Sequence, residues 1–172
     1  MAIDQWWNFF YMCGSAAATL TGLMFVSVTL GATLINKDTL KQVDAFLSPL
    51  FFHFLHVFFL CCIFAVPGGD PKIVAAAAIL SALWRLTTGI PKTVQVVHAL
   101  TRAHERDVDL SDWTMTTVLP VVVYLALIAA GVGLLLGLPR AIDILAASCL
   151  VLLISSAKGA WDTLVSIAAT LR

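Results

Sequence analysis

The sequence predicts an all-α polytopic membrane helix bundle with about five transmembrane helices, in a single domain over residues 1–172. Hydrophobic residues make up 60% of the chain, charged residues only 12%, and the mean hydropathy is +0.97. Soluble domains carry roughly 25% charged residues, so this composition is typical of a protein whose surface contacts lipid. Five apolar stretches each approach the roughly 20 residues that a helix needs to cross the hydrocarbon layer.

The first two predicted spans cover residues 6–35 and 45–66. The first contains no charged residue, and its start lacks the basic segment of a secretory signal, so we interpret it as a permanent helix. The second follows the sequence Asn36-Lys37-Asp38-Thr39, which is typical of a helix cap, and it continues through Pro49.

The third and fourth predicted spans cover residues 73–90 and 114–138. The third follows Pro67-Gly68-Gly69-Asp70-Pro71, whose glycines and prolines interrupt a helix. The fourth follows Ser111-Asp112, which is typical of an N-cap. Between them, residues 92–112 repeat apolar side chains at helical spacing, which predicts an amphipathic helix on the inner side of the membrane.

The fifth predicted span covers residues 142–163, and its apolar pattern continues to about Leu171, so we expect the last turns to project beyond the membrane. With five spans, alternate connections lie on opposite sides. One side carries only Lys72 and Arg140, whereas the other carries most of the Lys and Arg residues. This distribution predicts an N-terminus outside and a C-terminus inside.

Several polar residues lie at about the same depth in the membrane when their positions are counted along the predicted spans. At about 1.5 Å per residue, Arg85 lies about 20 Å from Lys72 on the third span, and Lys158 about 22 Å from Asp143 on the fifth. Asp162, four residues after Lys158, is the nearest carboxylate and a candidate ion-pair partner. We predict an intramembrane polar layer, with His56 just above it, formed by Thr19, His53, Arg85, Tyr124, Lys158 and Asp162.

Two interpretations of this layer remain open. Ionisable residues inside a span are costly and by default mark a functional site. However, Arg85 and Lys158 lie only about 10 Å from the inner boundary of a roughly 30 Å core, a distance that long side chains cross by snorkelling. They either anchor their helices at the interface or share a polar cluster. The excess of positive groups in such a cluster would favour an anion or a lipid phosphate.

Small residues recur four positions apart on three spans, which is typical of closely packed membrane helices. They predict tight packing, either within the bundle or between protomers, at Gly14, Ala18, Gly22, Ala129, Gly133, Gly137, Ser155 and Gly159. The first span also carries hydroxyl groups at Ser15, Thr19, Thr21, Ser27, Thr29 and Thr33. These hydroxyls either line a wet path or bond to carbonyls of the preceding turn.

The cysteines all fall inside predicted spans, and without a CxxC motif we interpret them as small buried apolar residues: Cys13, Cys61, Cys62 and Cys149. Three of them share a level about 10 Å from the outer face, which leaves a soft-metal or redox site as an alternative. His53 and His56 lie on one helix face, but no other span offers a facing histidine for a haem. We predict no cofactor, and metal binding stays open.

Enzyme motifs are missing, including GxSxG, HExxH, the Walker loop and GxGxxG. The formal net charge is zero, so nothing in the composition indicates a nucleic-acid partner. The missing motifs favour a non-enzymatic membrane protein, and the charge balance gives no reason to expect nucleic acid as a partner.

The chain opens with Trp7-x-x-Phe10, followed by the segment GSAAATLTGLMFV from Gly14 to Val26. This opening resembles the start of a family of small bacterial membrane proteins of unknown function, and the resemblance extends more weakly to Val66-Pro67-Gly68 and Ala160-Trp161. It implies a bacterial inner (cytoplasmic) membrane location, and it carries over no activity, ligand or catalytic residue.

These observations lead to two functional hypotheses. The first is a homo-oligomeric channel or transport protein, with the hydroxyl-rich first helix or the polar layer at its conduction path. The alternative is an accessory or assembly subunit of a larger membrane complex, which docks through its small-residue stripes. Both expect membrane lipid and a second protein chain as partners. A membrane enzyme or redox carrier that uses His53, His56 or the cysteines is a third, less favoured hypothesis.

Overall fold

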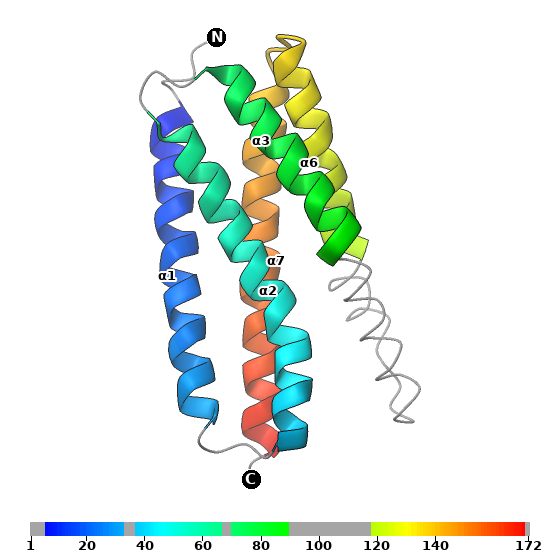
Figure 1. Cartoon of the computed structure of the whole chain (residues 1–172). Coiled ribbons are helices and arrows are strands. Elements are labelled where there is room, and N and C mark those ends of the chain that lie inside the picture. Colours follow the sequence, from blue (N-terminus) through cyan, green and yellow to red (C-terminus); the bar gives the residue numbers. More distant parts are fainter. Residues whose placement is uncertain (1–5, 33–36, 67–69, 90–117, 171–172) are drawn as a thin grey trace.

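A computed structural model describes residues 6–32, 37–66, 70–89 and 118–170, which form an up-and-down bundle of helices (Figure 1). The α-helices are α1 (Trp7–Ala32), α2 (Lys37–Phe64), α3 (Pro71–Trp84), α6 (Leu119–Leu135) and α7 (Ala141–Thr170). A π-helical turn, η2 (Arg85–Gly89), continues α3. The prediction of an all-α fold is confirmed.

Three helical segments are long and apolar enough to cross a membrane: Trp7–Thr29, Pro71–Gly89 and Ala141–Asp162. Two further apolar segments, Ser48–Phe64 and Leu119–Leu135, are shorter. Helix α2 begins before the predicted start of the second span, and Pro49 lies inside it. The predicted amphipathic segment 92–112 and the predicted N-cap Ser111-Asp112 lie outside the described residues.

Local sequence explains where α3 begins and where α6 ends. The Asp70 side chain caps α3 by accepting a hydrogen bond from the Lys72 backbone N–H at 2.9 Å, and Pro71 occupies the first turn. At the end of α6, Gly137 has a φ of 71°, and the N–H of Leu138 donates to the Gly133 carbonyl at 2.9 Å. This is a Schellman cap, so Gly137 ends the helix instead of packing against a neighbour.

Helices α2 and α7 pack against each other in the middle of the bundle, with α1 against α2 on one side and α3 paired with α6 on the other (Figure 1). The face of α3 toward α6 consists of small side chains such as Ala75 and Ala78, which are fully buried. A Cβ added to Gly131 on α6 would lie 2.9 Å from the Ala75 carbonyl oxygen. The close approach of these two helices therefore requires glycine at position 131, which the small-residue prediction did not include.

The predicted packing residues divide into two groups. A Cβ added to Gly14 would lie 2.9 Å from the Cys61 Cβ, and one added to Gly133 would lie 2.9 Å from the Ala141 Cβ. Gly159 approaches Leu50 on α2, with 3.1 Å between an added Cβ and the Leu50 Cδ2. These three positions serve packing within the bundle.

The other group faces outward. Ala18, Gly22 and Ala129 are exposed, and a Cβ added to Gly22 would meet nothing within 4 Å. Ser155 is half-buried, and its hydroxyl donates to the Leu152 carbonyl of its own helix at 3.2 Å. Helix α1 thus uses Gly14 inside the bundle and presents Ala18 and Gly22 on its surface.

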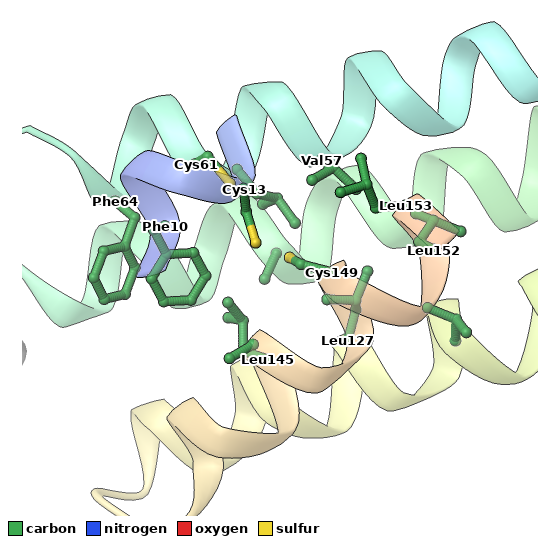
Figure 2. Close-up of a cluster of buried hydrophobic side chains, with 14 of the residues drawn as sticks. Phe10, Cys13, Val57, Cys61, Phe64, Leu127, Leu145, Cys149, Leu152 and Leu153 are labelled. Atoms are coloured by element: carbon green, nitrogen blue, oxygen red, sulfur yellow. The ribbon is translucent and has the colours of Figure 1, made fainter. Parts of the chain in front are cut away.

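The core at one end of the bundle is apolar and contains three of the four cysteines (Figure 2). Phe10 of α1 stacks on Phe64 of α2 with ring centroids 3.9 Å apart. Cys13, Cys61 and Cys149 come from α1, α2 and α7 and are all buried. Their burial agrees with the interpretation of the cysteines as small apolar residues, whereas Cys62 is exposed.

Candidate functional site

Beyond the apolar core, four segments of the chain bring polar side chains together. We call this set the polar cluster: His53 and His56 of α2, Arg85 of η2, Tyr124 of α6 and Ser156 of α7. Every member is buried, with at most 6% of its surface exposed. Burying polar groups is costly unless they are paired, so their partners indicate what the cluster can do.

Tyr124 lies at the centre of the polar cluster and is fully buried. Its ring meets His56 and His53 edge-on, with centroid separations of 5.1 Å and 5.8 Å. The His53 Nδ1 lies 3.2 Å from the Ser156 Oγ, which ties α2 to α7. These contacts hold one face of the cluster in place through interactions between helices.

Arg85 is the only charged member of the polar cluster. Its Nε donates to the Tyr124 Oη at 3.5 Å, the outer limit of a hydrogen bond, and its guanidinium carbon lies 5.3 Å from the centroid of the Phe52 ring. A cation over an aromatic face gains some electrostatic stabilisation. No carboxylate of the described residues lies within ion-pair distance of it. Arg85 is therefore a buried cation whose charge the described part of the chain leaves uncompensated.

The backbone around Arg85 departs from α-helical geometry. Thr88 donates its hydroxyl to the Trp84 carbonyl at 2.6 Å, and Thr87 donates to the Leu83 carbonyl at 3.0 Å. Gly89 completes the π-helical turn, and a Cβ added to it would lie 2.5 Å from the Arg85 Nη1. Such turns occur frequently at functional sites because they displace a side chain from its regular helical position. Here the space beside the glycine accommodates the guanidinium.

His56 carries an unsatisfied polar atom. Its Nε2 is buried and has no hydrogen-bond partner. Leaving a buried polar group unpaired costs about 1–3 kcal/mol, and such groups in native proteins often await a ligand or an ordered water. His56 and Arg85 are both among the residues that line one cavity.

That cavity is a groove of about 680 Å³ between α2 and α3, partly open to the outside of the bundle. We call it the α2–α3 groove. His56, Ser81 and Arg85 supply its polar groups, and its remaining lining is apolar: Phe52, Leu55, Phe58, Phe59, Cys62, Ala77, Leu80 and Trp84. A volume of roughly 300–1,000 Å³ is typical of small-molecule sites.

The structure brings together three of the six residues of the predicted polar layer: His53, Arg85 and Tyr124. Lys158 and Asp162 form the expected pair at 2.8 Å, but on the exposed surface of α7, where 61% and 52% of their side chains are accessible. Thr19 is also exposed, and it donates to the Ser15 carbonyl. Of the two basic residues, Arg85 alone belongs to the polar cluster.

Sequence reasoning missed part of the site. Ser156 lies two positions before Lys158, and a serine in a span gives no signal that separates it from the many hydroxyls that bond to their own helix. His56 was expected just above the layer, whereas its ring contacts Tyr124 within it. The π-helical turn was not predicted, because apolar periodicity does not reveal it, and the aromatic groove wall was not predicted, because it depends on how α2 and α3 pack.

The hydroxyls of α1 are occupied within their own helix. Ser15, Thr19, Thr21, Ser27 and Thr29 each donate to the carbonyl four residues before, at 2.7–2.9 Å. Of the two interpretations given above, this geometry favours the local one over a wet path.

The described residues contain no group of three or more His, Cys, Asp or Glu side chains arranged to hold a metal ion. His98 and His104 lie outside the described residues.

No family model matches the chain, and no curated protein and no solved structure matches it either. Any functional argument therefore depends on the polar cluster and the α2–α3 groove.

Proposed function

We propose that this chain is a five-span protein of a bacterial inner membrane that binds an anionic ligand inside its helix bundle and transports it without enzymatic chemistry. The observation that carries the proposal is Arg85, a buried cation with no carboxylate partner among the described residues. A buried charge without a counter-ion is strongly unfavourable, so a bound anion would offset this cost.

Five spans are supported by the arrangement of the helices. The shorter apolar segments, Ser48–Phe64 and Leu119–Leu135, pack alongside α7, which is long enough to cross. A stretch of about 17 residues is the lower limit for crossing the hydrocarbon core. Large apolar side chains such as Met12, Leu80 and Ile154 face outward from the bundle, as a lipid-exposed surface requires. The basic residues favour an outside N-terminus, and the bacterial location rests on the resemblance of the first helix.

Transport is favoured over an open channel because the polar groups gather inside the bundle instead of following a path along it. The cluster offers guanidinium, imidazole and hydroxyl groups, and all of these can donate hydrogen bonds to an oxyanion. Arginine also binds carboxylate and phosphate through two parallel hydrogen bonds. The hydroxyls of α1, the other candidate path, are bonded to their own helix.

Thermal unfolding of the delipidated protein in detergent tests anion binding. We expect methyl phosphate to raise the melting temperature above that in chloride at equal ionic strength, because a ligand that binds only the folded state stabilises it. Arg85→Gln should abolish this rise. Lys158→Gln, which removes an exposed cation, should retain it.

Absence of the rise in the wild-type protein, or its persistence in Arg85→Gln, would contradict the proposed binding site. Transport is then measured in liposomes as movement of the bound anion between the two faces. Liposomes that stay impermeable to it would contradict the transport role.

A second candidate function is that of an accessory subunit in a larger membrane complex or a homo-oligomer. It is favoured by the outward face of α1, where Ser15, Ala18 and Gly22 present small exposed side chains on which another helix can approach closely. Native mass spectrometry of the gently extracted protein should then show a defined assembly. Repeated isolation of the monomer alone would exclude this role.

A further inference from the structure

The α2–α3 groove joins the polar cluster to the outside of the bundle. Its walls are mostly aromatic and aliphatic side chains of α2 and α3, and its polar groups come from His56, Ser81 and Arg85. We propose that the ligand of the polar cluster is an anionic phospholipid, which enters sideways from the membrane with an acyl chain in the groove and its phosphate against Arg85 and His56. This inference rests on the proposed function, because it names the class of anion that the cluster binds.

The charge of Arg85 and the hydrogen-bonding groups of Arg85 and His56 favour a phosphate head group. The Nε of Arg85 contacts Tyr124, and no described residue accepts a hydrogen bond from its terminal nitrogens. His56, whose buried Nε2 has no hydrogen-bond partner, is also one of the residues that line the groove. A phosphate offers two oxygens to the guanidinium fork and a further acceptor to an imidazole N–H. One phosphate would therefore compensate the buried charge and satisfy the unpaired nitrogen together.

The apolar lining of the groove favours a ligand with an apolar tail. Phe52, Phe58, Phe59 and Trp84 line it together with aliphatic residues, and the cavity of about 680 Å³ is far larger than an inorganic phosphate requires. A small hydrated anion would leave this apolar surface unfilled, whereas an acyl chain would cover it. The groove is partly open to the outside of the bundle, so in the proposed site the bilayer itself would supply the ligand.

The depth of Arg85 distinguishes this site from ordinary contact with surrounding lipid. Counting along α3 and η2 at about 1.5 Å per residue places Arg85 roughly 20 Å from the outer end of the helix. In a core of about 30 Å, this is about 10 Å inside the inner boundary. A phosphate bound there has left the head-group level, as a lipid does on its way across the membrane.

Native mass spectrometry of the full chain, delipidated and titrated with phosphatidylglycerol, tests the inference. Phosphatidylcholine with the same acyl chains, a fatty acid and methyl phosphate serve as comparison ligands. We expect phosphatidylglycerol to bind at a stoichiometry of one per chain, and at least about tenfold more tightly than phosphatidylcholine. Arg85→Gln should weaken it by about ten- to a hundredfold, as expected for loss of a hydrogen bond to a charged group.

A second variant distinguishes the contribution of the groove to lipid binding from the contribution of the Arg85 charge. Ala77→Phe places a large side chain in the α2–α3 groove while Arg85 is kept. It should weaken phosphatidylglycerol binding about tenfold or more and leave methyl phosphate binding within about twofold. Lys158→Gln is the matched control and should bind both ligands like the wild-type protein.

Trp84 gives an independent readout, because it lines the groove beside Arg85. Phosphatidylglycerol brominated on its acyl chain should quench Trp84 fluorescence more strongly than brominated phosphatidylcholine in a variant that keeps Trp84 as its only tryptophan. Equal quenching by both lipids would contradict a specific site.

The outcomes distinguish the two proposals. Binding of methyl phosphate without binding of phosphatidylglycerol would overturn the lipid inference and leave the anion site intact, and preference for the fatty acid would do the same. Failure of every anion to bind would overturn both. Phosphatidylglycerol binding that survives both Arg85→Gln and Ala77→Phe would show nonspecific lipid contact.

Discussion

Two sets of polar side chains within the bundle differ in how their hydrogen bonds are satisfied. On α1, hydroxyls such as Ser15 and Thr19 donate to carbonyls of their own helix. In the polar cluster, His53 bonds to Ser156 on another helix, Arg85 reaches Tyr124 across α3 and α6, and His56 keeps an unpaired nitrogen. The first set needs no tertiary partner, whereas the second exists only because four segments meet.

The difference shows that a polar residue in an apolar helix is not in itself evidence of a site. A hydroxyl can be satisfied by the preceding turn at little cost. A guanidinium carries five N–H donors, and an imidazole carries a donor and an acceptor on opposite sides of a rigid ring. The preceding turn cannot satisfy either group, so their partners must come from other helices or from a ligand. The functional signal lies in the polar groups that their own helix cannot satisfy.

The largest expected effect is at Tyr124, which connects both histidines to Arg85. Tyr124→Ala should reduce the free energy of unfolding by about 3–5 kcal/mol, because it removes a fully buried ring and leaves a cavity. Titration with SDS from mixed micelles measures this change. Tyr124→Phe keeps the ring and should cost only about 1 kcal/mol, the net value of one hydrogen bond. Equal losses in both variants would mean that the hydroxyl, and not the ring, holds the cluster together.

A smaller effect is expected where α1 meets α2. Gly14→Ala places a Cβ 2.9 Å from the Cys61 Cβ, so the helices must separate, and we expect a loss of about 1–3 kcal/mol. Gly22→Ala is the matched control in the same helix, because its Cβ would meet nothing within 4 Å. If the two variants unfold alike, the packing of α1 described here is incorrect.

The smallest effects on stability are expected for two variants that compare the two sets of polar groups directly. Ser156→Ala removes the partner of His53 and should cost about 0.5–1.5 kcal/mol, because the imidazole loses its buried hydrogen bond. Thr19→Val removes an exposed hydroxyl that is bonded to its own helix and should change stability by less than about 0.5 kcal/mol. A larger loss for Thr19→Val would reverse the distinction between the two sets.

Much of the fold follows from sequence because helix formation and helix ends are local. Composition predicts apolar helices, and the glycines and prolines of residues 67–71 predict the break before the third span. Helix α3 nevertheless begins at Pro71, two residues before the predicted start, because Asp70 caps it and proline is favoured in a first turn. The first turns of α2 are polar, so the apolar criterion places the start of the second span at residue 45, whereas the helix begins at Lys37, within the cap-like sequence of residues 36–39.

The sequence predicted the level along the helices at which the candidate site lies, but not which helix face each residue occupies. Rise per residue brought His53, Arg85 and Tyr124 to one level, and they do meet. The same count included Lys158, which lies on the opposite face of α7 from the cluster, whereas Ser156, two residues earlier, points into it. Which face of an apolar helix is buried depends on packing between helices, and a helix that is apolar all round gives no amphipathic signal for it.

The most direct test of the central claim is the affinity of the delipidated protein for methyl phosphate, measured by calorimetry in parallel for the wild-type protein, Arg85→Gln and Lys158→Gln. If the buried cation is the anion site, Arg85→Gln should weaken binding by about ten- to a hundredfold, the value of a hydrogen bond to a charged group, while Lys158→Gln leaves it unchanged. Equal affinities in all three proteins would contradict the account, because Arg85 would then be a buried charge without a ligand.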